Sequence, residues 1–371
     1  MSNNIYTDVG SDILTASSAP PPLPAMQPEP TTHRFAFGGT AMAYFKIWIV
    51  NLVLTIITLG IYSPWAKVRR LRYFYGNTHL DGKSFDFTAN PKRILIGRLI
   101  AIAIYIAISV FGQLSPEIAF AGAILLFLIF PWMLRSTLRF MARNSQFNNV
   151  RFGFGGTLAA AYVVMLLILL ILVLNFVSLG LLTPFTIWLF KRYQFDNTYF
   201  GQLKFNFNTG VWDMYKAMIL PLLAFLVVML LGGGFIFSQA ETMASPDGSL
   251  PPAAIAIIAV IYAVMLLIFP LMQGYIHRAI WGKLTLGDNR FVLVNFSPLK
   301  FAFISLTNVI ATVLSVGLLH PWAAVRMHRY KTETLALSVV DDFDALTTPS
   351  ADNISPLAEE ISDVFDFDVS W

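Results

Sequence analysis

The repeat that decides the fold begins in the stretch LGIYSPWAKVRRLRYFYGNTHLDGKSFDF, residues 59–87. Pro64 in this stretch is followed eight residues later by Arg72. The same spacing recurs in five copies: Pro64 and Arg72, Pro131 and Arg139, Pro184 and Arg192, Pro270 and Arg278, and Pro321 and Arg329. A fixed spacing repeated along a chain indicates that the fold is built from similar units.

An aromatic pair follows the proline in most copies, at 21 and 23 residues beyond it. The pairs are Phe85 and Phe87, Phe152 and Phe154, Phe205 and Phe207, and Phe291 with Leu293. This alternation predicts a short Phe-x-Phe strand at the end of each unit. The fifth copy lacks the pair because the chain there enters an acidic tail.

Three copies also share a glycine four residues before the proline and an Arg-Tyr dipeptide after it. The glycine and proline pairs are Gly60 and Pro64, Gly180 and Pro184, and Gly317 and Pro321. Glycine closes a helix in the left-handed conformation, and proline suits the first turn of the next helix. Each unit is therefore predicted to contain a membrane helix, a tight turn, an interfacial amphipathic helix and a strand.

The composition excludes a soluble globule. Of the 371 residues, 56% are hydrophobic and 12% are charged, whereas soluble domains carry roughly 25% charged residues. The chain has no cysteine, which excludes disulfides, thiolate metal sites and cysteine nucleophiles. Most of the chain is expected to have lipid as its solvent.

Seven apolar stretches approach the ~20 residues that a helix needs to cross a bilayer. They cover residues 41–59, 94–112, 118–134, 158–179, 216–237, 253–271 and 299–316. Nothing alternates polar and apolar residues over ten-residue stretches, so we exclude a membrane β-barrel. The expected fold class is an all-α integral membrane protein of about seven transmembrane helices, with internal repeats.

The distribution of basic residues bears on topology. No Lys or Arg lies between Arg98 and Arg135, or between Lys216 and Arg278. Both gaps predict helical hairpins whose tips, 113–116 and 238–252, point away from the cytoplasm. If the other three stretches each cross once, the repeated modules face both sides, as in an inverted repeat. If these stretches are re-entrant, the basic residues stay cytoplasmic; the uncharged stretch 158–179 favours seven crossings.

Arginines and asparagines supply the candidate site residues. Arginines beside a membrane suit anionic lipid phosphates, although topology anchoring is the simpler and favoured explanation. The candidate lipid contacts are Arg69, Arg70, Arg72, Arg139, Arg192, Arg278 and Arg329. Asn51, Asn175 and Asn308 lie within apolar stretches, where asparagine either bonds a neighbouring helix or lines a polar path.

The two ends of the chain differ from its middle. Residues 1–34 are polar and rich in proline, 35–335 form the predicted membrane domain, and 336–371 form an acidic tail. The chain up to Lys331 carries a net charge of +14, and the remainder carries −10. The tail is expected to be disordered. It either solubilises the protein, recruits a soluble partner, or folds back onto the basic loops.

Several kinds of chemistry lack support in the sequence. No Asp or Glu lies within the apolar stretches, which disfavours a proton relay or a cation pathway. The histidines, His33, His79, His277, His320 and His328, show no metal-ligand spacing. No phosphate-binding loop or catalytic triad is recognisable. We therefore expect no enzymatic activity and no cofactor, and lipid rather than nucleic acid as the partner of the basic loops.

The stretch LTIITLGIY at 54–62, with Phe37-Gly38-Gly39-Thr40 before it and Pro64-Trp65-Ala66 after it, resembles the YjgN-type bacterial inner-membrane proteins, a family of unassigned function. Tyr44-Phe45, Asn51 and the later Asn197-Thr198 with Gly201 are similar to the same pattern. The resemblance covers roughly residues 33–335. It implies a polytopic protein of a bacterial cytoplasmic membrane, and it brings no catalytic residues.

Two functions follow as hypotheses. The repeated units around Asn51, Asn175 and Asn308 favour a channel or carrier for a small solute or lipid. The alternative is a non-enzymatic scaffold or stress-response component that binds anionic lipid and recruits a soluble partner through its tails.

Overall fold

The computed structural model describes residues 30–238 and 252–340, and these ranges contain ten helices and ten strands. The helices are α1 (Ala41–Ile57), α2 (Ser63–Gly76), α3 (Pro91–Phe111), α4 (Pro116–Asn144), α5 (Leu158–Val177), α6 (Thr183–Asp196), α7 (Val211–Ser238), α9 (Pro252–Trp281), α10 (Pro298–Leu314) and α11 (His320–Glu333). The strands are β1 (Thr31–Phe37), β2 (Thr78–Leu80), β3 (Lys83–Phe87), β4 (Ser145–Phe147), β5 (Val150–Phe154), β6 (Thr198–Phe200), β7 (Leu203–Phe207), β8 (Leu284–Leu286), β9 (Asn289–Leu293) and β10 (Leu335–Val339).

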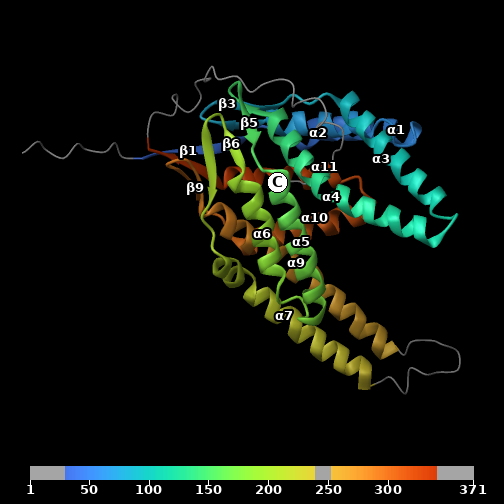
Figure 1. The fold of residues 1–371 in the computed structure, drawn as a ribbon. Coiled ribbons are helices and arrows are strands. Elements are labelled where there is room, and N and C mark those ends of the chain that lie inside the picture. Colours follow the sequence, from blue (N-terminus) through green and yellow to red (C-terminus); the bar gives the residue numbers. More distant parts are fainter. Residues whose placement is uncertain (1–29, 239–251, 341–371) are drawn as a thin grey trace, which may run out of the picture.

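The elements repeat as two helices followed by a β-hairpin. Four hairpins, β2–β3, β4–β5, β6–β7 and β8–β9, are each made within one unit. The fifth hairpin joins the two ends of the described chain, because β10 pairs with β1 and places Val339 opposite Thr31 (Figure 1). The fifth unit is therefore complete: Phe35 and Phe37 of β1 supply the aromatic pair that we expected it to lack.

The ten strands form one closed antiparallel barrel in the order β1-β10-β9-β8-β7-β6-β5-β4-β3-β2. The expectation of an all-α protein without a barrel is wrong. It rested on the absence of ten-residue alternating stretches, and a membrane-spanning strand does need about 9–11 residues. These strands have three to seven residues, so they are too short to cross a bilayer and build a barrel outside it.

Phenylalanine side chains fill the barrel. Neighbouring rings form a closed circuit with centroids 4.6 to 6.4 Å apart, in the order Phe35, Phe85, Phe147, Phe200, Phe152, Phe205, Phe291 and back to Phe35. Leu80, Leu286 and Leu337 are buried in the same cluster. A small barrel whose interior is occupied by side chains is a packed core and not a pore.

Five helices are long and apolar enough to cross a membrane: α3, α4, α5, α7 and α9 from Ala254 onward. The helices α1 and α10 have 17 residues each and are shorter. The expected seven transmembrane helices are therefore not found. In the most apolar parts of the five long helices, only 6% to 11% of the residues are buried inside the protein, which leaves their surfaces for lipid.

The closed barrel also decides the sidedness of the units. Because all ten strands pair in one barrel, every unit starts and ends at that barrel. The returning helices α2, α6 and α11 have 14 residues each, which gives about 21 Å and is too short to recross the ~30 Å hydrocarbon layer. The three units that contain them leave the barrel and return to it as hairpins, which we call re-entrant units, and this arrangement does not fit an inverted repeat.

The tight turns of these three units have left-handed glycines. Gly60, Gly180 and Gly317 have φ values of +91°, +85° and +89°. The prolines that follow, Pro64, Pro184 and Pro321, lie in the first turn of α2, α6 and α11. In the other two units the expected turn is absent, because Pro131 and Pro270 lie inside the continuous helices α4 and α9.

The boundaries of the membrane domain differ slightly from the predicted ones. Strand β1 begins at Thr31 and β10 ends at Val339, so each strand takes a few residues from a segment expected to be a tail. The remainder of both predicted tails, 1–29 and 341–371, and most of the predicted hairpin tip 238–252 lie outside the described residues.

Candidate functional site

The repeated arginines lie in a layer between the barrel and the apolar hairpins, and two of them bind the backbone below the barrel. Arg72 donates from Nε to the carbonyl of Phe87 at 3.0 Å and from Nη2 to that of Ala89 at 3.1 Å. Arg329 donates from Nη2 to the carbonyl of Gly39 at 2.8 Å. Gly39 and Ala89 occupy the same place in their units, in the linker from the second strand to the next helix. These arginines hold the linkers to the interfacial helices.

The other two linkers with this geometry are held by side chains one turn earlier. Arg135 donates from Nε to the carbonyl of Gly156 at 2.6 Å, and the indole of Trp188 donates to the carbonyl of Thr209 at 2.8 Å. Both donors stand four residues after the proline of their unit. Four of the five linkers are thus fixed by a side-chain donor at the same acceptor position.

The tyrosine of the Arg-Tyr dipeptide ties the two ends of each re-entrant unit together. Its hydroxyl donates to the backbone carbonyl of the residue that caps the unit's first helix. The pairs are Tyr73 with Thr40 at 2.7 Å, Tyr193 with Thr157 at 3.4 Å, and Tyr330 with Ser297 at 2.9 Å. Burial raises the pKa of Tyr193 to about 12, so this tyrosine stays a donor at neutral pH.

The remaining candidate arginines have varied surroundings. Arg192 pairs with Asp196 at 3.4 Å and lies 5.0 Å from the ring of Trp188. Arg69 donates to the hydroxyl of Tyr62 at 2.9 Å. Arg278 is exposed on α9, whereas Arg70 and Arg139 are half-buried. Lipid contact through these arginines stays a prediction.

The three asparagines make hydrogen bonds within their own units. Asn51 and Asn308 donate to the carbonyls of Ala66 and Ala323, at 3.4 and 3.0 Å, and each also accepts a bond from an arginine of the returning helix, Arg69 or Arg326. The carboxamide oxygen of Asn175 accepts from the backbone N–H of Leu182 at 2.9 Å. Asn51 and Asn308 thus bond the returning helix of their unit, whereas Asn175 bonds the residue that precedes α6. Both predicted roles of the three asparagines stay predictions.

The fold brings four other polar residues together beneath the barrel, and we call them the basic cluster: Lys191 and Gln194 of α6, His277 of α9 and Lys331 of α11. Lys191 and His277 stand seven residues after their unit's proline, and Gln194 and Lys331 stand ten after it. Positions three residues apart share one face of a helix. The shared repeat register is the sequence signal for this cluster, and the spacing of the histidines relative to metal-ligand motifs does not reveal it.

Aromatic rings link the members of the basic cluster and connect them to the barrel. Lys331 Nζ lies 5.5 Å from the ring centre of Phe301, and the His277 ring lies 6.1 Å from the same ring. Lys191 Nζ lies 5.9 Å from the ring centre of Phe195. Trp281 contacts both Phe195 and His277, at 6.1 and 6.0 Å. The cluster therefore lies directly below the phenylalanine core, with which Phe195 and Trp281 also pack.

The electrostatics of the basic cluster favour an anion. Burial, followed by the charge of Lys331, lowers the pKa of Lys191 to about 8, and burial lowers the pKa of Lys331. No carboxylate is among the groups that shift these pKa values. Gln194 Oε1 accepts from Lys191 Nζ at 3.0 Å. Gln194 Nε2 and His277 Nε2 are buried and have no hydrogen-bond partner within the described chain.

His328 lies near this layer but belongs to the packed interior. Its ring contacts Phe37 and Phe74 at 4.8 and 4.7 Å, and its Nε2 lies 3.2 Å from the hydroxyl of Thr78. Burial, followed by the charge of Lys331, lowers its pKa to about 4. Across residues 30–238 and 252–340, no group of three His, Asp or Glu side chains is arranged to hold a metal ion.

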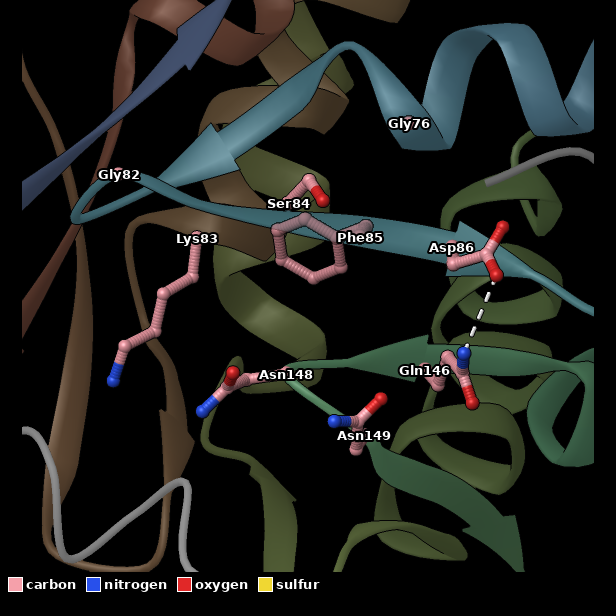
Figure 2. A pocket seen from close by; sticks show the side chains of 9 residues that line it. All are labelled: Gly76, Gly82, Lys83, Ser84, Phe85, Asp86, Gln146, Asn148 and Asn149. Atoms are coloured by element: carbon pink, nitrogen blue, oxygen red, sulfur yellow. Dashed lines mark hydrogen bonds between the residues drawn. The ribbon is translucent and has the colours of Figure 1, made fainter.

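A polar cleft of about 530 Å³ lies elsewhere, on the barrel wall across β3 and β4. Figure 2 shows its lining, with Lys83, Asn148 and Asn149 near the hairpin tips, and Asp86 joined to Gln146 by a 3.3 Å hydrogen bond. Its two described charges, Lys83 and Asp86, are of opposite sign, so the cleft lacks the excess of one charge that distinguishes the basic cluster.

The fold and the site define a polytopic membrane protein in which apolar hairpins extend from a packed barrel. The family described as "Bacterial protein of unknown function (DUF898)" matches residues 32–364, and the chain belongs to this family. No solved structure matches the chain.

Curated relatives are named "Inner membrane protein YjgN". The protein of Escherichia coli O157:H7 is 27% identical over 242 residues, and that of Escherichia coli strain K12 is 28% identical over 243; each match covers 56% of this chain and 60% of the relative. The protein of Salmonella typhimurium strain LT2 is 36% identical over 154 residues, which cover 40% of this chain and 39% of the relative. The matches thus span less than two thirds of the relatives' length. The chain is a multi-pass inner-membrane protein.

Proposed function

We propose that this protein binds an anionic amphiphile, with the headgroup in the basic cluster and the acyl chains along the apolar hairpins. The proposal rests on one observation: the half-buried Lys191 and Lys331 share a layer with the buried Gln194, whose Nε2 has no hydrogen-bond partner in the described chain, and no carboxylate shifts the pKa of either lysine. Cations that are partly withdrawn from water favour anionic partners. A headgroup at the level of the bilayer surface meets this requirement.

A lipid carrier or holder is better supported than a channel through the barrel. The phenylalanine circuit fills the barrel, so a solute path along its axis has no support. The long hairpins α3–α4 and α7–α9 extend away from the barrel in different directions (Figure 1). Their surfaces are almost entirely apolar and unburied, which suits acyl chains. We place the barrel in the cytoplasm because the basic residues gather on its side.

Binding can be measured by native mass spectrometry of the full chain in detergent, with phosphatidylglycerol, phosphatidylcholine or inorganic phosphate added. We expect phosphatidylglycerol to bind and phosphatidylcholine to bind more weakly. Hydrogen bonds to charged groups contribute ~1.5–3 kcal/mol, so the double variant Lys191→Gln/Lys331→Gln should bind at least ~10-fold more weakly. The matched control, Lys46→Gln/Lys92→Gln, changes two exposed lysines and should bind normally.

Two results would contradict the proposal. Equal binding by the double variant and the wild type would show that the basic cluster does not hold the headgroup. Binding of inorganic phosphate with the same dependence on Lys191 and Lys331, but without any lipid binding, would identify a soluble anion as the ligand.

A further inference from the structure

A second set of cations lies on the outer wall of the barrel. Arg34, Arg151, Lys204 and Arg290 each stand one residue before an inward-facing phenylalanine: Phe35, Phe152, Phe205 or Phe291. Successive side chains of a strand point to opposite faces, so these four cations point outward, and all four are exposed. We call them the cationic belt; they come from four of the five hairpins.

The cationic belt lacks anionic partners in the described part of the chain. None of its four members forms an ion pair there. Of the described carboxylates in the barrel, Asp81 and Asp86 contact His33 at 3.2 Å and Gln146 at 3.3 Å, and Asp288 in the β8–β9 turn forms no ion pair with a belt residue. Like charges that encircle a small barrel repel one another, and an anionic chain laid around it relieves that repulsion.

The C-terminal segment 341–371 has the composition of such a chain. It contains nine Asp and Glu residues and no Lys, Arg or His. It follows β10 directly, where Ser338 lies opposite Arg290 and the Val340 N–H donates to Asn289 Oδ1 at 3.1 Å. Its 31 residues can extend to about 100 Å, so the segment starts beside the belt and can reach all of it.

We propose that segment 341–371 docks on the cationic belt of its own barrel and covers it against other polyanions. Attachment to the chain gives the segment an effective local concentration in the millimolar range. Many weak charge pairs then suffice to hold it, and salt should release it, because exposed pairs are screened at high ionic strength.

The chain has no cysteine, so introduced cysteines are unique labelling sites. We place spin labels at Ser370→Cys in the segment and Ser84→Cys, which occupies the belt position of the β2–β3 hairpin. Distances are measured by pulsed electron paramagnetic resonance on the full chain in detergent. At low salt we expect a short, salt-sensitive distance population. The belt variant Arg34→Gln/Arg151→Gln/Lys204→Gln/Arg290→Gln should lose at least half of this population.

A matched control changes four exposed lysines near the starts of membrane helices: Lys46→Gln/Lys92→Gln/Lys216→Gln/Lys300→Gln. It should keep the short distance. A tail variant, Asp363→Asn/Asp366→Asn/Asp368→Asn, should lose it without any change in the barrel, which covers the case that the belt variant misfolds. An unchanged distance in the tail variant, an equal loss in the lysine control, or disappearance of the short distance on dilution with unlabelled protein would overturn intramolecular docking.

Discussion

Phe35 of β1 stacks on Phe85 of the neighbouring hairpin with ring centroids 6.1 Å apart, and also lies 6.4 Å from Phe291 on the other side. Phe35 is the fifth member of a set of equivalent residues, Phe85, Phe152, Phe205 and Phe291. The beginning of the described chain therefore completes the repeat that its end leaves open. Barrel closure depends on this contact between segments about 300 residues apart.

Loss of this ring should destabilise the whole barrel. Truncation of a packed phenylalanine to alanine costs about 3 kcal/mol or more, so Phe35→Ala should lower the unfolding temperature of a chain of this size by about 4 °C or more. The measurement is thermal unfolding in detergent, followed by tryptophan fluorescence. Phe303→Ala removes a ring that is 61% exposed on α10 and should leave the unfolding temperature nearly unchanged. Equal effects of the two variants would contradict a closed aromatic core.

The linker arginines should contribute to stability more than to lipid binding. Arg72→Ala leaves the carbonyls of Phe87 and Ala89 without their donor, which should cost ~1.5–3 kcal/mol of unfolding free energy. Arg278→Ala removes an exposed arginine at the same repeat position, and we expect little change. Chemical denaturation of both variants measures the two changes in unfolding free energy. A larger loss in Arg278→Ala would show that the repeat position acts through something other than the linker.

Anion binding at the basic cluster should weaken as the pH rises through about 8. The pKa of Lys191 is lowered to about 8, so its ammonium is charged below that pH and neutral above it. Gln194, His277 and Lys331 face the same site. Phosphatidylglycerol binding at pH 7 should exceed binding at pH 9, and Lys191→Arg should reduce this difference because arginine stays charged. An identical pH profile in wild type and Lys191→Arg would exclude Lys191 as the titrating group.

The same pKa shift predicts the pH dependence of folding. Between pH 8 and about 10.5, the unfolded chain keeps the Lys191 proton that the folded chain has lost, so the free energy of unfolding rises with pH in this window. Lys191→Gln should lack this increment. Denaturation of both proteins at pH 7.5 and pH 10 measures it. A contribution from Lys191 that falls with pH would mean that the folded protein stabilises the charged form.

The pairing of β1 with β10 can be tested by cross-linking. Thr32 and Ser338 lie opposite each other in this pair, at a spacing of about 4.5–5.5 Å between Cα atoms that permits a disulfide. Thr32→Cys/Ser338→Cys should form an intramolecular bond on mild oxidation, visible as a faster-migrating band. Thr32→Cys/Ser178→Cys serves as the unpaired control. Formation of dimers alone would indicate exchange of β1 between chains.

The sequence could predict the units but not how they assemble. The spacing from Pro64 to Arg72 and Phe85 indicated a repeat, and the Phe-x-Phe pattern indicated short strands. Strands of three to five residues within units carry too little information to show that they pair across units. The closing pair is less accessible still, because Phe35 belongs to the fifth unit only through β1–β10 pairing. Charge counts alone could not choose between single crossings and re-entrant hairpins.

The site residues, too, could be predicted from the sequence only in part. Arg72 and Arg329 were identified by their spacing, yet their acceptors are backbone carbonyls that no sequence pattern marks. Lys191 and Lys331 occupy different repeat positions, and only the arrangement of α6 and α11 around the barrel axis brings them into one layer. Membership of the family and location in the inner membrane, by contrast, were readable from residues 54–66 and from the apolar stretches.

The most direct test of the central claim is the sidedness of the five β-hairpins. Single cysteines at Thr31, Gly82, Asn149, Gly201 and Asp288 mark the membrane-distal ends of all five, and Ser115→Cys marks the tip of the α3–α4 hairpin. In intact spheroplasts, a membrane-impermeant maleimide should label Ser115→Cys and leave all five hairpin cysteines unlabelled until the membrane is permeabilised. Labelling of any hairpin cysteine from the side that labels Ser115→Cys would contradict a single barrel on one face of the membrane.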